Sequence, residues 1–345
     1  MTMEAIWRKR SKPTLKTDRH YDGDLESTAL RQCEDLINTP GQLDFKYVAE
    51  GRANVVFSIW ESKDPAAQKG RFEGTLLRVP KATQGITPCD YKTLHDFHEN
   101  QVEVQVGPEH LVPQTLINIS ADVASTLNAK RNKNKDDDSV IQAGYAMLIQ
   151  DMSESPGYSV LEFKPKWLAQ SPIAPPGATR CRTCAREAFR NSQRVKAGKA
   201  VTVPICPLGL LHEDHAVVTY TIARLAPEWT KRDRERLADA LKESRILEKL
   251  RELQTKGDPG SALLDNPSDP AFGLAMTLRD CSCYVRMPLD VEKDVEIKLA
   301  DVDKKNWEEK QSYWQESHWN LVNNGWYTGE GQDEAHIDTA CVLNL

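Results

Sequence analysis

The sequence predicts an α+β fold in two lobes. The chain has 345 residues, enough for one large two-lobed domain or two domains, and is 39% hydrophobic and 28% charged, as in ordinary globular proteins. Short runs rich in β-branched and aromatic residues concentrate in the first 150 residues. Helical patterns mixed with further strands follow a polar connection at Asp151. We therefore expect lobes over 1–150 and 151–345.

The first lobe is expected to be mainly sheet. Residues 43–62 are typical of two strands joined at Gly51, and strands are also expected over 74–81 and 143–152. A helix is expected over 89–106, where GPEHLVPQ ends it. The polar run 128–139 predicts a solvated loop.

The second lobe is expected to mix helices and strands. The expected strands cover 159–168, 274–287 and 294–303, and the expected helices cover 181–194, 228–253 and 305–327. The last helix would bury Trp307, Trp314 and Leu321 and end at Gly325. Strands first, then a mixed lobe with acidic residues at strand ends, is the layout of a two-lobed kinase.

Charge and apolar patterning exclude several classes of protein. No apolar run approaches the ~20 residues of a membrane span, and the basic N-terminus lacks the apolar core of a secretory signal. That N-terminal cluster is either a nuclear-import signal or a solvated tail. We expect a soluble monomer inside the cell, nuclear or cytoplasmic, with its eight cysteines reduced.

A basic patch stands out against the net charge of −6. Residues 164–199 hold nine Lys or Arg and one acid, Glu187. Lys164 and Lys166 alternate on the expected strand, so they would face one side. On the following helix, Arg182, Arg186, Arg190 and Arg194 are spaced by four, which places like charges together. A polyanionic ligand explains this pattern better than general nucleic-acid binding; the alternatives are a lysine-guarded edge strand and a solvated helix face.

A glycine turn and several carboxylates complete the candidate site. In EGRANVVF, Gly51 would let backbone amides approach a phosphate, and Arg78 on the next strand would supply a cation; the alternatives are a plain hairpin turn and a surface charge. Asp280, Asp301 and Asp303 would end two adjacent strands, where carboxylates bind Mg²⁺ in phosphoryl transfer. An isolated Asp there more often caps a turn.

The cysteines offer a separate metal hypothesis. Cys181 and Cys184 form a C-x₂-C half-site, and Cys206 with His212 or His215 would complete a structural Zn²⁺ site. The alternative is a set of buried thiols. Cys281 and Cys283 alternate on an expected strand and are interpreted as core residues.

Six motifs occur here in the order found in inositol-pentakisphosphate 2-kinases, especially fungal ones: EGRANVV, HLVPQ, LEFKPKWLAQSP, CRTCAREAFRN, AMTLRDCSCYVR and EIKLADVDKK…YW. The resemblance spans about residues 45–330 of this sequence. It implies a protein-kinase-like two-lobed fold with an enlarged C-lobe. It also implies Mg²⁺-dependent transfer of the ATP γ-phosphate to the 2-hydroxyl of inositol 1,3,4,5,6-pentakisphosphate, giving the hexakisphosphate.

The resemblance also implies roles for individual residues. Asp280 would be the general base, with Lys164 beside the transferred phosphate. The other implied residues are Gly51, Arg52, Ala53, Asn54, Arg78 and Asp151 for ATP, Lys166, Arg182, Arg186, Arg190, Lys305 and Tyr313 for the inositide, and Asp301 with Asp303 for the metal.

This chain departs from the family pattern at two positions. Arg186 stands where relatives often have His, and Glu309 followed by Lys310 stands where they have a basic residue. Two alternatives to the 2-kinase remain: a non-catalytic polyanion binder and another inositol polyphosphate kinase. A protein kinase is disfavoured because the chain has no HRD-x₄-N or DFG motif.

Overall fold

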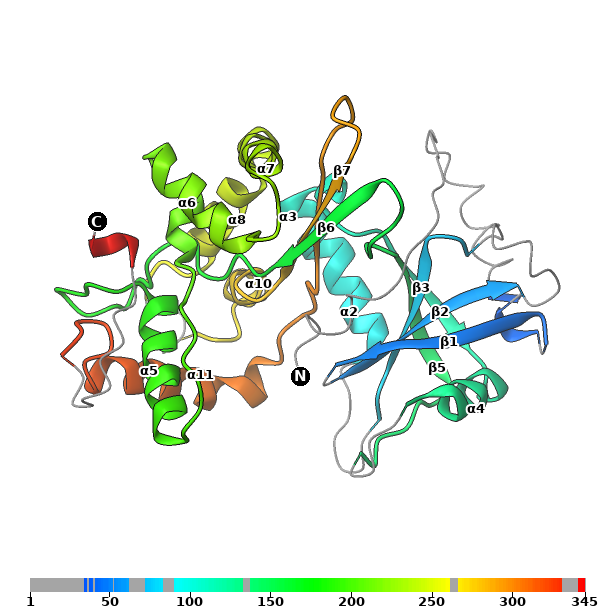
Figure 1. The fold of residues 1–345 in the computed structure, drawn as a ribbon. Coiled ribbons are helices and arrows are strands. Elements are labelled where there is room, and N and C mark those ends of the chain that lie inside the picture. The colour runs from blue at the N-terminus through cyan, green and yellow to red at the C-terminus, as the bar shows by residue number, and fades with distance from the viewer. Residues whose placement is uncertain are drawn as a thin grey trace. The chain divides into compact units, whose positions relative to one another are not determined.

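A computed structural model describes residues 34–35, 37–39, 41–51, 53–61, 72–82, 90–132, 137–260, 266–330 and 341–344. The chain divides into two compact units. Unit 1 comprises 1–97, 112–160 and 288–290, and unit 2 comprises 98–111, 161–287 and 291–345. The basic N-terminal stretch lies outside the described residues. The chain mixes helices with antiparallel sheets (Figure 1), so the α+β class is confirmed.

Unit 1 is built on a five-stranded antiparallel sheet with the order β1-β2-β3-β5-β4. The strands are β1 (Leu43–Glu50), β2 (Asn54–Glu61), β3 (Thr75–Pro80), β4 (Gln114–Ile119) and β5 (Gly144–Gln150). Side chains alternate between the two faces, as the pleat requires. On β5, Ala146 and Leu148 join the main core, whereas Met147 packs on the opposite face.

A helix covers each face of this sheet. α4 (Ala121–Lys130) packs Val123 and Leu127 into the main core, and Ser120 caps it by accepting from the Val123 amide. On the other face, α2 (Tyr91–Phe97) packs Tyr91 and Leu94 against Met147. The chain continues from α2 through a π-helical stretch (His98–Glu103) into α3 (Val104–Val106), so one helical segment is confirmed over most of 89–106.

Unit 2 holds most of a small sheet and most of the described helices. The sheet has the order β6-β7-β8, with β6 (Tyr158–Phe163), β7 (Ser282–Pro288) and β8 (Glu296–Ala300). The helices are α5 (Arg182–Lys196), α6 (His215–Leu225), α7 (Lys231–Ser244), α8 (Ile246–Gly257), α10 (Pro270–Leu278) and α11 (Trp307–Asn323), with 3₁₀ turns at Pro108–His110, Pro207–Leu211 and Val342–Asn344. α8 packs closely against α10, and α5 against α11.

Three sequence predictions for unit 2 are wrong. The expected strand 274–287 begins as helix α10, because Asp269 caps a first turn that starts at Pro270; only β7 is extended. The single helix expected over 228–253 is two, because Arg245 adopts a left-handed backbone (φ +54°) between α7 and α8. The expected strand 159–168 ends at Phe163, so Lys164 and Lys166 do not alternate on it.

Two further expectations need correction. Part of the run 128–139 is not solvated, since Arg131 and Ser139 are buried. Trp307 and Trp314 are only partly buried, whereas Leu321 is in the core. Gly325 has a positive φ of 66° directly after the C-cap Asn324, and the end of α11 is therefore confirmed.

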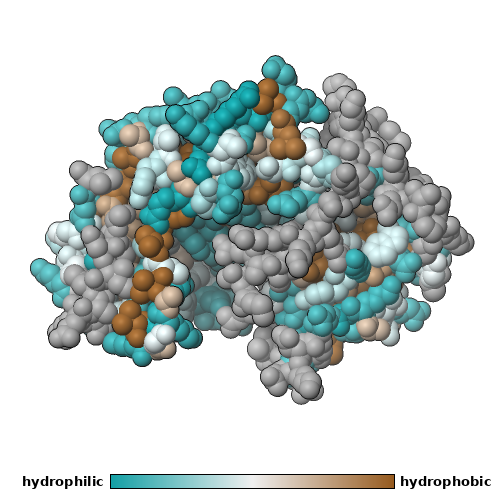
Figure 2. Space-filling view, viewed as in Figure 1, coloured by the Kyte–Doolittle hydropathy of each residue, from teal (hydrophilic) through white to brown (hydrophobic). Residues whose placement is uncertain are grey.

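The described surface is mixed in polarity. In Figure 2, the coloured part of the visible face is largely hydrophilic (teal), and brown apolar patches include some over the region of α5 and α11. Along the described chain, no helix combines the length and the apolar character that a bilayer crossing requires.

Candidate active site

Three lysines and two aspartates of unit 2 form one charged cluster. Lys164 Nζ lies 3.1 Å from Asp301 Oδ2 and 3.5 Å from Asp280 Oδ1, and donates to the Asp280 carbonyl at 2.7 Å. Lys305 Nζ lies 3.1 Å from Asp280 Oδ2, and Lys166 Nζ lies 4.0 Å from Asp280 Oδ1. Both aspartate side chains are about half exposed, so a ligand can reach them.

The backbone places these side chains at the ends of elements. Asp280 lies in the turn between α10 and β7, not at the end of a strand, and its amide donates to the Thr277 carbonyl at 3.0 Å. Asp301 and Asp303 follow β8, as predicted. Lys166 and Asp301 have positive φ angles of 58° and 55°, and such backbone strain in non-glycine residues is common at functional sites.

Attraction between the lysines and the aspartates keeps the side chains of this cluster ionised. Burial lowers the pKa of Lys164, but the carboxylates of Asp301 and Asp280 outweigh it and raise that pKa above its ordinary value. Burial opposes ionisation of Asp280, yet Lys305 and Lys164 hold its pKa below the usual range. For Lys166, burial together with the charges of Lys164, Arg186 and Arg190 lowers the pKa despite Asp280. An added anion would relieve this repulsion.

A pocket of about 290 Å³ lies in the same unit, between α5 and α11. Its lining residues are Arg186, Phe189, Arg190, Tyr313, Glu316, Ser317 and Asn320. Arg186 Nη2 donates to the Tyr313 hydroxyl at 2.6 Å, while Arg190 pairs with Glu187. Burial lowers the pKa of Arg186, and the positive charge of the neighbouring Arg190 lowers it further because the two like charges lie close together.

The four arginines of α5 have different surroundings. Arg182 is 6% exposed, lies 4.7 Å from the centre of the Trp167 ring, and has a buried Nη1 without a hydrogen-bond partner. It does not line the pocket. Arg194 bonds Asn191 and Thr202, away from the pocket. Only Arg186 and Arg190 therefore present their guanidinium groups to this hollow.

A buried network that supports the Lys164–Lys166 segment was not anticipated from the sequence. Gln254 of α8 accepts from the Leu168 amide and donates to the Lys166 carbonyl, both at 2.9 Å, and donates to the Leu278 carbonyl. Arg279 pairs with buried Asp258 at 2.6 Å and lies 3.6 Å from the Trp167 ring centre. Burial lowers the pKa of Arg279 to about 10, despite the carboxylate of Asp258. The only sequence signal was the tryptophan of KPKW.

The glycine turn of unit 1 connects β1 and β2. Gly51 N donates to the Asn54 carbonyl at 2.9 Å, and the Ala53 carbonyl accepts from the Lys81 amide. A Cβ added at Gly51 would meet no atom within 4 Å, so packing within the described protein does not require glycine here. With its oxygen accepting from Arg78 Nη2 (2.6 Å), the Asn54 amide donates to the Tyr91 hydroxyl. Arg52 lies outside the described residues, and Asp151 accepts from the Ser153 amide in a turn.

The buried side chain of Arg131 supports the start of this turn, a role that was not predicted from the sequence. Its side chain is 1% exposed, bonds Glu50 at 2.6 Å, and pairs with Asp137. Lys81 adds longer contacts to the same two acids. Because Glu50 directly precedes Gly51, this network positions the turn.

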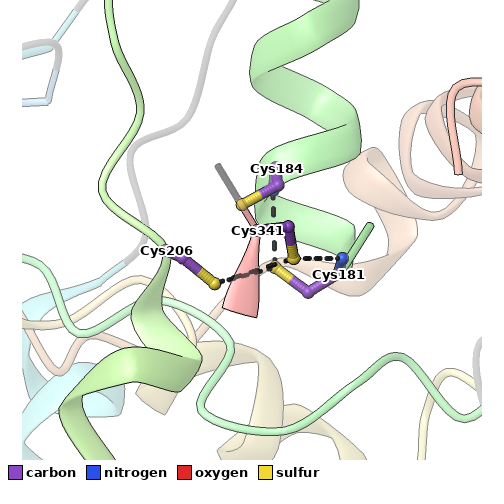
Figure 3. Close-up of side chains that lie close together, drawn as sticks. All are labelled: Cys181, Cys184, Cys206 and Cys341. Atoms are coloured by element: carbon purple, nitrogen blue, oxygen red, sulfur yellow. Dashed lines mark hydrogen bonds between the residues drawn. The ribbon is translucent and has the colours of Figure 1, made fainter. Parts of the chain in front are cut away.

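Four buried cysteines form a second cluster in unit 2 (Figure 3). Cys181, Cys184 and Cys206 come together as the sequence predicted, but the fourth member is Cys341, and neither His212 nor His215 belongs to the group. Cys281 and Cys283 are fully buried apart from this group, which confirms them as core residues.

Comparison with known proteins identifies a matching family and a similar relative. The family model for inositol-pentakisphosphate 2-kinase matches residues 47–318. An inositol-pentakisphosphate 2-kinase from Yarrowia lipolytica is 32% identical over 211 residues, which are 61% of this chain and 65% of the relative. The matched region thus covers slightly less than two thirds of that relative's length.

Proposed function

This chain belongs to the inositol-pentakisphosphate 2-kinase family, and from that premise we propose that it transfers the γ-phosphate of ATP to the 2-hydroxyl of inositol 1,3,4,5,6-pentakisphosphate. The observation that carries the proposal is the contact of Lys164 with both Asp280 and Asp301, in the same unit as the basic pocket of α5. A transferring phosphoryl group needs cations, a metal-binding carboxylate and a proton acceptor at one place.

In this proposal Asp280 takes the proton of the attacking hydroxyl. Its depressed pKa keeps it ionised at neutral pH, as a proton acceptor must be. Lys164 and Lys305, which pair with the aspartates in the free protein, turn toward substrate phosphates when these arrive. Lys164 then contacts the transferred phosphate, and Lys166 and Lys305 contact the inositide.

The carboxylates after β8 fit a Mg²⁺ ion. Asp301 is 42% exposed and offers a carboxylate oxygen, the ligand type that Mg²⁺ prefers. Asp301 and Asp303 would hold the ion, which when bound neutralises charge developing on the phosphates. In unit 1, Gly51 to Asn54 and Arg78 would bind the ATP phosphates, and Asp151 belongs to the same proposed site.

The inositide is assigned to the pocket between α5 and α11. Arg186, Arg190 and Tyr313 would contact its phosphates, since guanidinium groups match phosphate geometry bidentately. Arg182, over Trp167, would act from the base of the helix with its unpartnered Nη1. A substrate lacking one phosphate would leave a cation unpaired, which gives selectivity.

The same proposal extends to the lobes, the oligomeric state and the location of the protein. We assign residues 1–150 to a nucleotide-binding N-lobe and 151–345 to an enlarged inositide-binding C-lobe of a protein-kinase-like fold. The protein would act as a monomer in the nucleus or cytoplasm, without a specific nucleic-acid partner.

The direct test is incubation with ATP, Mg²⁺ and inositol 1,3,4,5,6-pentakisphosphate, with the products resolved by anion-exchange chromatography. The proposal expects hexakisphosphate formed in proportion to the ADP released. ADP release without a new inositide, or phosphorylation of a different inositol phosphate only, would overturn it.

A pair of variants on one helix tests the pocket. Arg186→Ala should weaken inositide binding about tenfold to a hundredfold, as expected for losing a charge-assisted contact, and leave nucleotide affinity unchanged. Arg194→Ala removes the same charge from α5 but not from the pocket, and should change inositide binding less than threefold. Calorimetric titration of each ligand separates the two. Equal losses from both variants would make the helix charge, rather than the pocket, responsible.

A further inference from the structure

The side chain of Gln254, near the end of α8, connects two backbone segments of the charged cluster. It is only 1% exposed. Its Oε1 accepts from the Leu168 amide at 2.9 Å, and its Nε2 donates to the Lys166 carbonyl at 2.9 Å and to the Leu278 carbonyl at 3.2 Å. The first two groups follow the K-P-K motif, and the third ends α10, two residues before Asp280. One buried amide therefore bonds the backbone on both sides of the candidate site.

The backbone of Lys166 needs this support because it lies in the left-handed region, with φ +58°. A residue with a Cβ is strained there, and such a conformation persists only where the surrounding contacts fix it. Pro165 restricts the backbone before Lys166, and Gln254 bonds the next two peptide groups after it. The resulting turn places the Lys166 ammonium 4.0 Å from Asp280 Oδ1.

The Asp280 turn is attached to the same end of α8. The Leu278 carbonyl is among the last carbonyls of α10, which have no partner within the helix, and Gln254 supplies one. Arg279, directly before Asp280, donates to the backbone carbonyl of Gln254 at 3.2 Å and pairs with Asp258 at 2.6 Å. The end of α8 thus bonds both the segment that carries Lys166 and the segment that carries Asp280.

We propose that Gln254 is a positioning residue for phosphoryl transfer: its amide fixes the Lys166 ammonium, which binds the inositide, relative to the Asp280 carboxylate, which takes the hydroxyl proton. The inference rests on the proposed function, from which Lys166 and Asp280 have these roles. Without the amide, three backbone groups lose their partner, and the strained backbone of Lys166 relaxes. Inositide affinity and turnover then fall together, although Gln254 itself is buried away from any ligand.

The test compares Gln254→Glu with Asn128→Asp in the full chain, because each change replaces an amide donor by an oxygen of nearly the same shape. Asn128 of α4 also bonds three backbone groups, the Ala124 carbonyl and the amide and carbonyl of Ile141, but in unit 1. Both variants should be less stable in urea. Only Gln254→Glu should weaken inositol hexakisphosphate binding and lower kcat, each by about tenfold to a hundredfold, as for a displacement of about 1 Å at the site. The KM for ATP should be unchanged in both.

A double-mutant cycle separates positioning from a general loss of stability. Lys166→Met removes the ammonium but keeps most of the side-chain length. In that background Gln254→Glu should weaken hexakisphosphate binding by less than about threefold, because the group that it positions is already gone. Additive losses in the cycle would overturn the inference. Gln254→Met, which keeps the volume of the side chain without its hydrogen bonds, takes the place of Gln254→Glu in the cycle where the latter fails to fold.

Failure of this inference can be distinguished from failure of the proposed function. A wild type that forms the hexakisphosphate, together with a Gln254→Glu enzyme that loses only stability, would overturn the positioning role alone. Equal losses of turnover in Gln254→Glu and Asn128→Asp would do the same, since they would follow from stability. A wild type that neither binds nor phosphorylates the inositide would overturn both the proposed function and the role of Gln254 in it.

Discussion

Asp280 is the proposed proton acceptor, and of the three lysines around its carboxylate, Lys164 and Lys305 lie 3.5 Å and 3.1 Å away. Asp280→Asn keeps the shape of the side chain but removes the proton acceptor. We expect kcat to fall by about 10²–10⁴. Inositide affinity should be unchanged or higher, since the lysines lose a competing carboxylate. Single-turnover kinetics and calorimetric titration measure the two quantities.

A matched control for this variant lies in the same unit. Asp294, exposed before β8, has no contact with the lysine cluster among the described interactions, and Asp294→Asn should leave kcat within twofold. An Asp280→Asn enzyme with wild-type turnover would assign the base elsewhere. Parallel losses of kcat and binding would make Asp280 a structural residue.

His318 predicts a specific loss of stability in acid. It is 1% exposed on α11, its Nδ1 has no hydrogen-bond partner, and burial together with Arg182 lowers its pKa to about 4. The unfolded chain has the ordinary value of about 6.5, so it takes up a proton first as the pH falls. Stability is therefore complete above pH 6.5 and declines by about 2–3 kcal/mol between pH 6.5 and 4.

The measurement is urea unfolding of wild type and His318→Gln across that pH range. The glutamine cannot become charged, so the difference between the two proteins should depend on pH between 6.5 and 4 and be constant above 6.5. His215→Gln, at an exposed position, should follow the wild-type profile. A pH profile of His318→Gln parallel to that of the wild type would mean that other groups cause the acid sensitivity.

At the scale of elements, the contact of α8 with α10 depends on one glycine. A Cβ at Gly257 would lie 2.3 Å from the Ala271 carbonyl oxygen and 3.0 Å from Ala275 Cβ, and backbone cannot move aside as a flexible side chain does. Gly257→Ala should therefore lower the free energy of unfolding by about 1–3 kcal/mol. Because α8 also carries Gln254, which bonds the Lys166 carbonyl, kcat/KM should fall as well.

The control is Gly273 on the facing helix. An added Cβ there meets nothing within 4 Å, and alanine favours helix by about 1 kcal/mol over glycine, so Gly273→Ala should be neutral or stabilising. Chemical denaturation compares the two. Equal stability of Gly257→Ala and the wild type would show that the two helices can separate without cost.

An element could be predicted from the sequence where its own residues carry the signal that identifies it. The β-branched and aromatic residues of β1 and β2 around Gly51 and the arginines spaced by four on α5 are local signals, and all three elements were predicted from them. The apolar run of α10 has no decisive period, because a buried helix and a buried strand look alike over a few residues. The break at Arg245 comes from a left-handed residue that no glycine or proline signals.

The candidate site likewise contains residues that could be predicted from the sequence and residues that could not. The charged motifs predicted the Lys164, Asp280 and Asp301 cluster, although by a wrong local geometry for Lys164 and Asp280. Gln254 and Cys341 were missed because their partners lie 86 and 160 residues away, a separation at which spacing carries no information. Arg131 was interpreted as part of a solvated run because Glu50, the partner that draws it toward the turn, lies 81 residues away in the sequence, although its other partner, Asp137, belongs to the same run.

At the scale of the whole molecule, the charged residues of the candidate site divide between the two units. The described contacts of Lys164, Lys166, Lys305 and the α5 arginines all lie in unit 2, whereas the glycine turn and Arg78 lie in unit 1. A highly charged inositide should therefore bind residues of unit 2, and a nucleotide should bind residues of unit 1. Hydrogen exchange resolves the two, because a ligand at 100 times its Kd slows local opening by about 100-fold.

We expect saturating inositol hexakisphosphate to slow exchange within 164–190 and 301–313 and to leave β1–β3 unchanged. A non-hydrolysable ATP analogue with Mg²⁺ should slow exchange around the turn between β1 and β2 and at β3. Arg186→Ala should weaken only the first pattern at the same inositide concentration, since its contacts lie entirely in unit 2. Protection of β1–β3 by the hexakisphosphate, with α5 unaffected, would place the inositide on the other unit and remove the basis for assigning Asp280 as its proton acceptor.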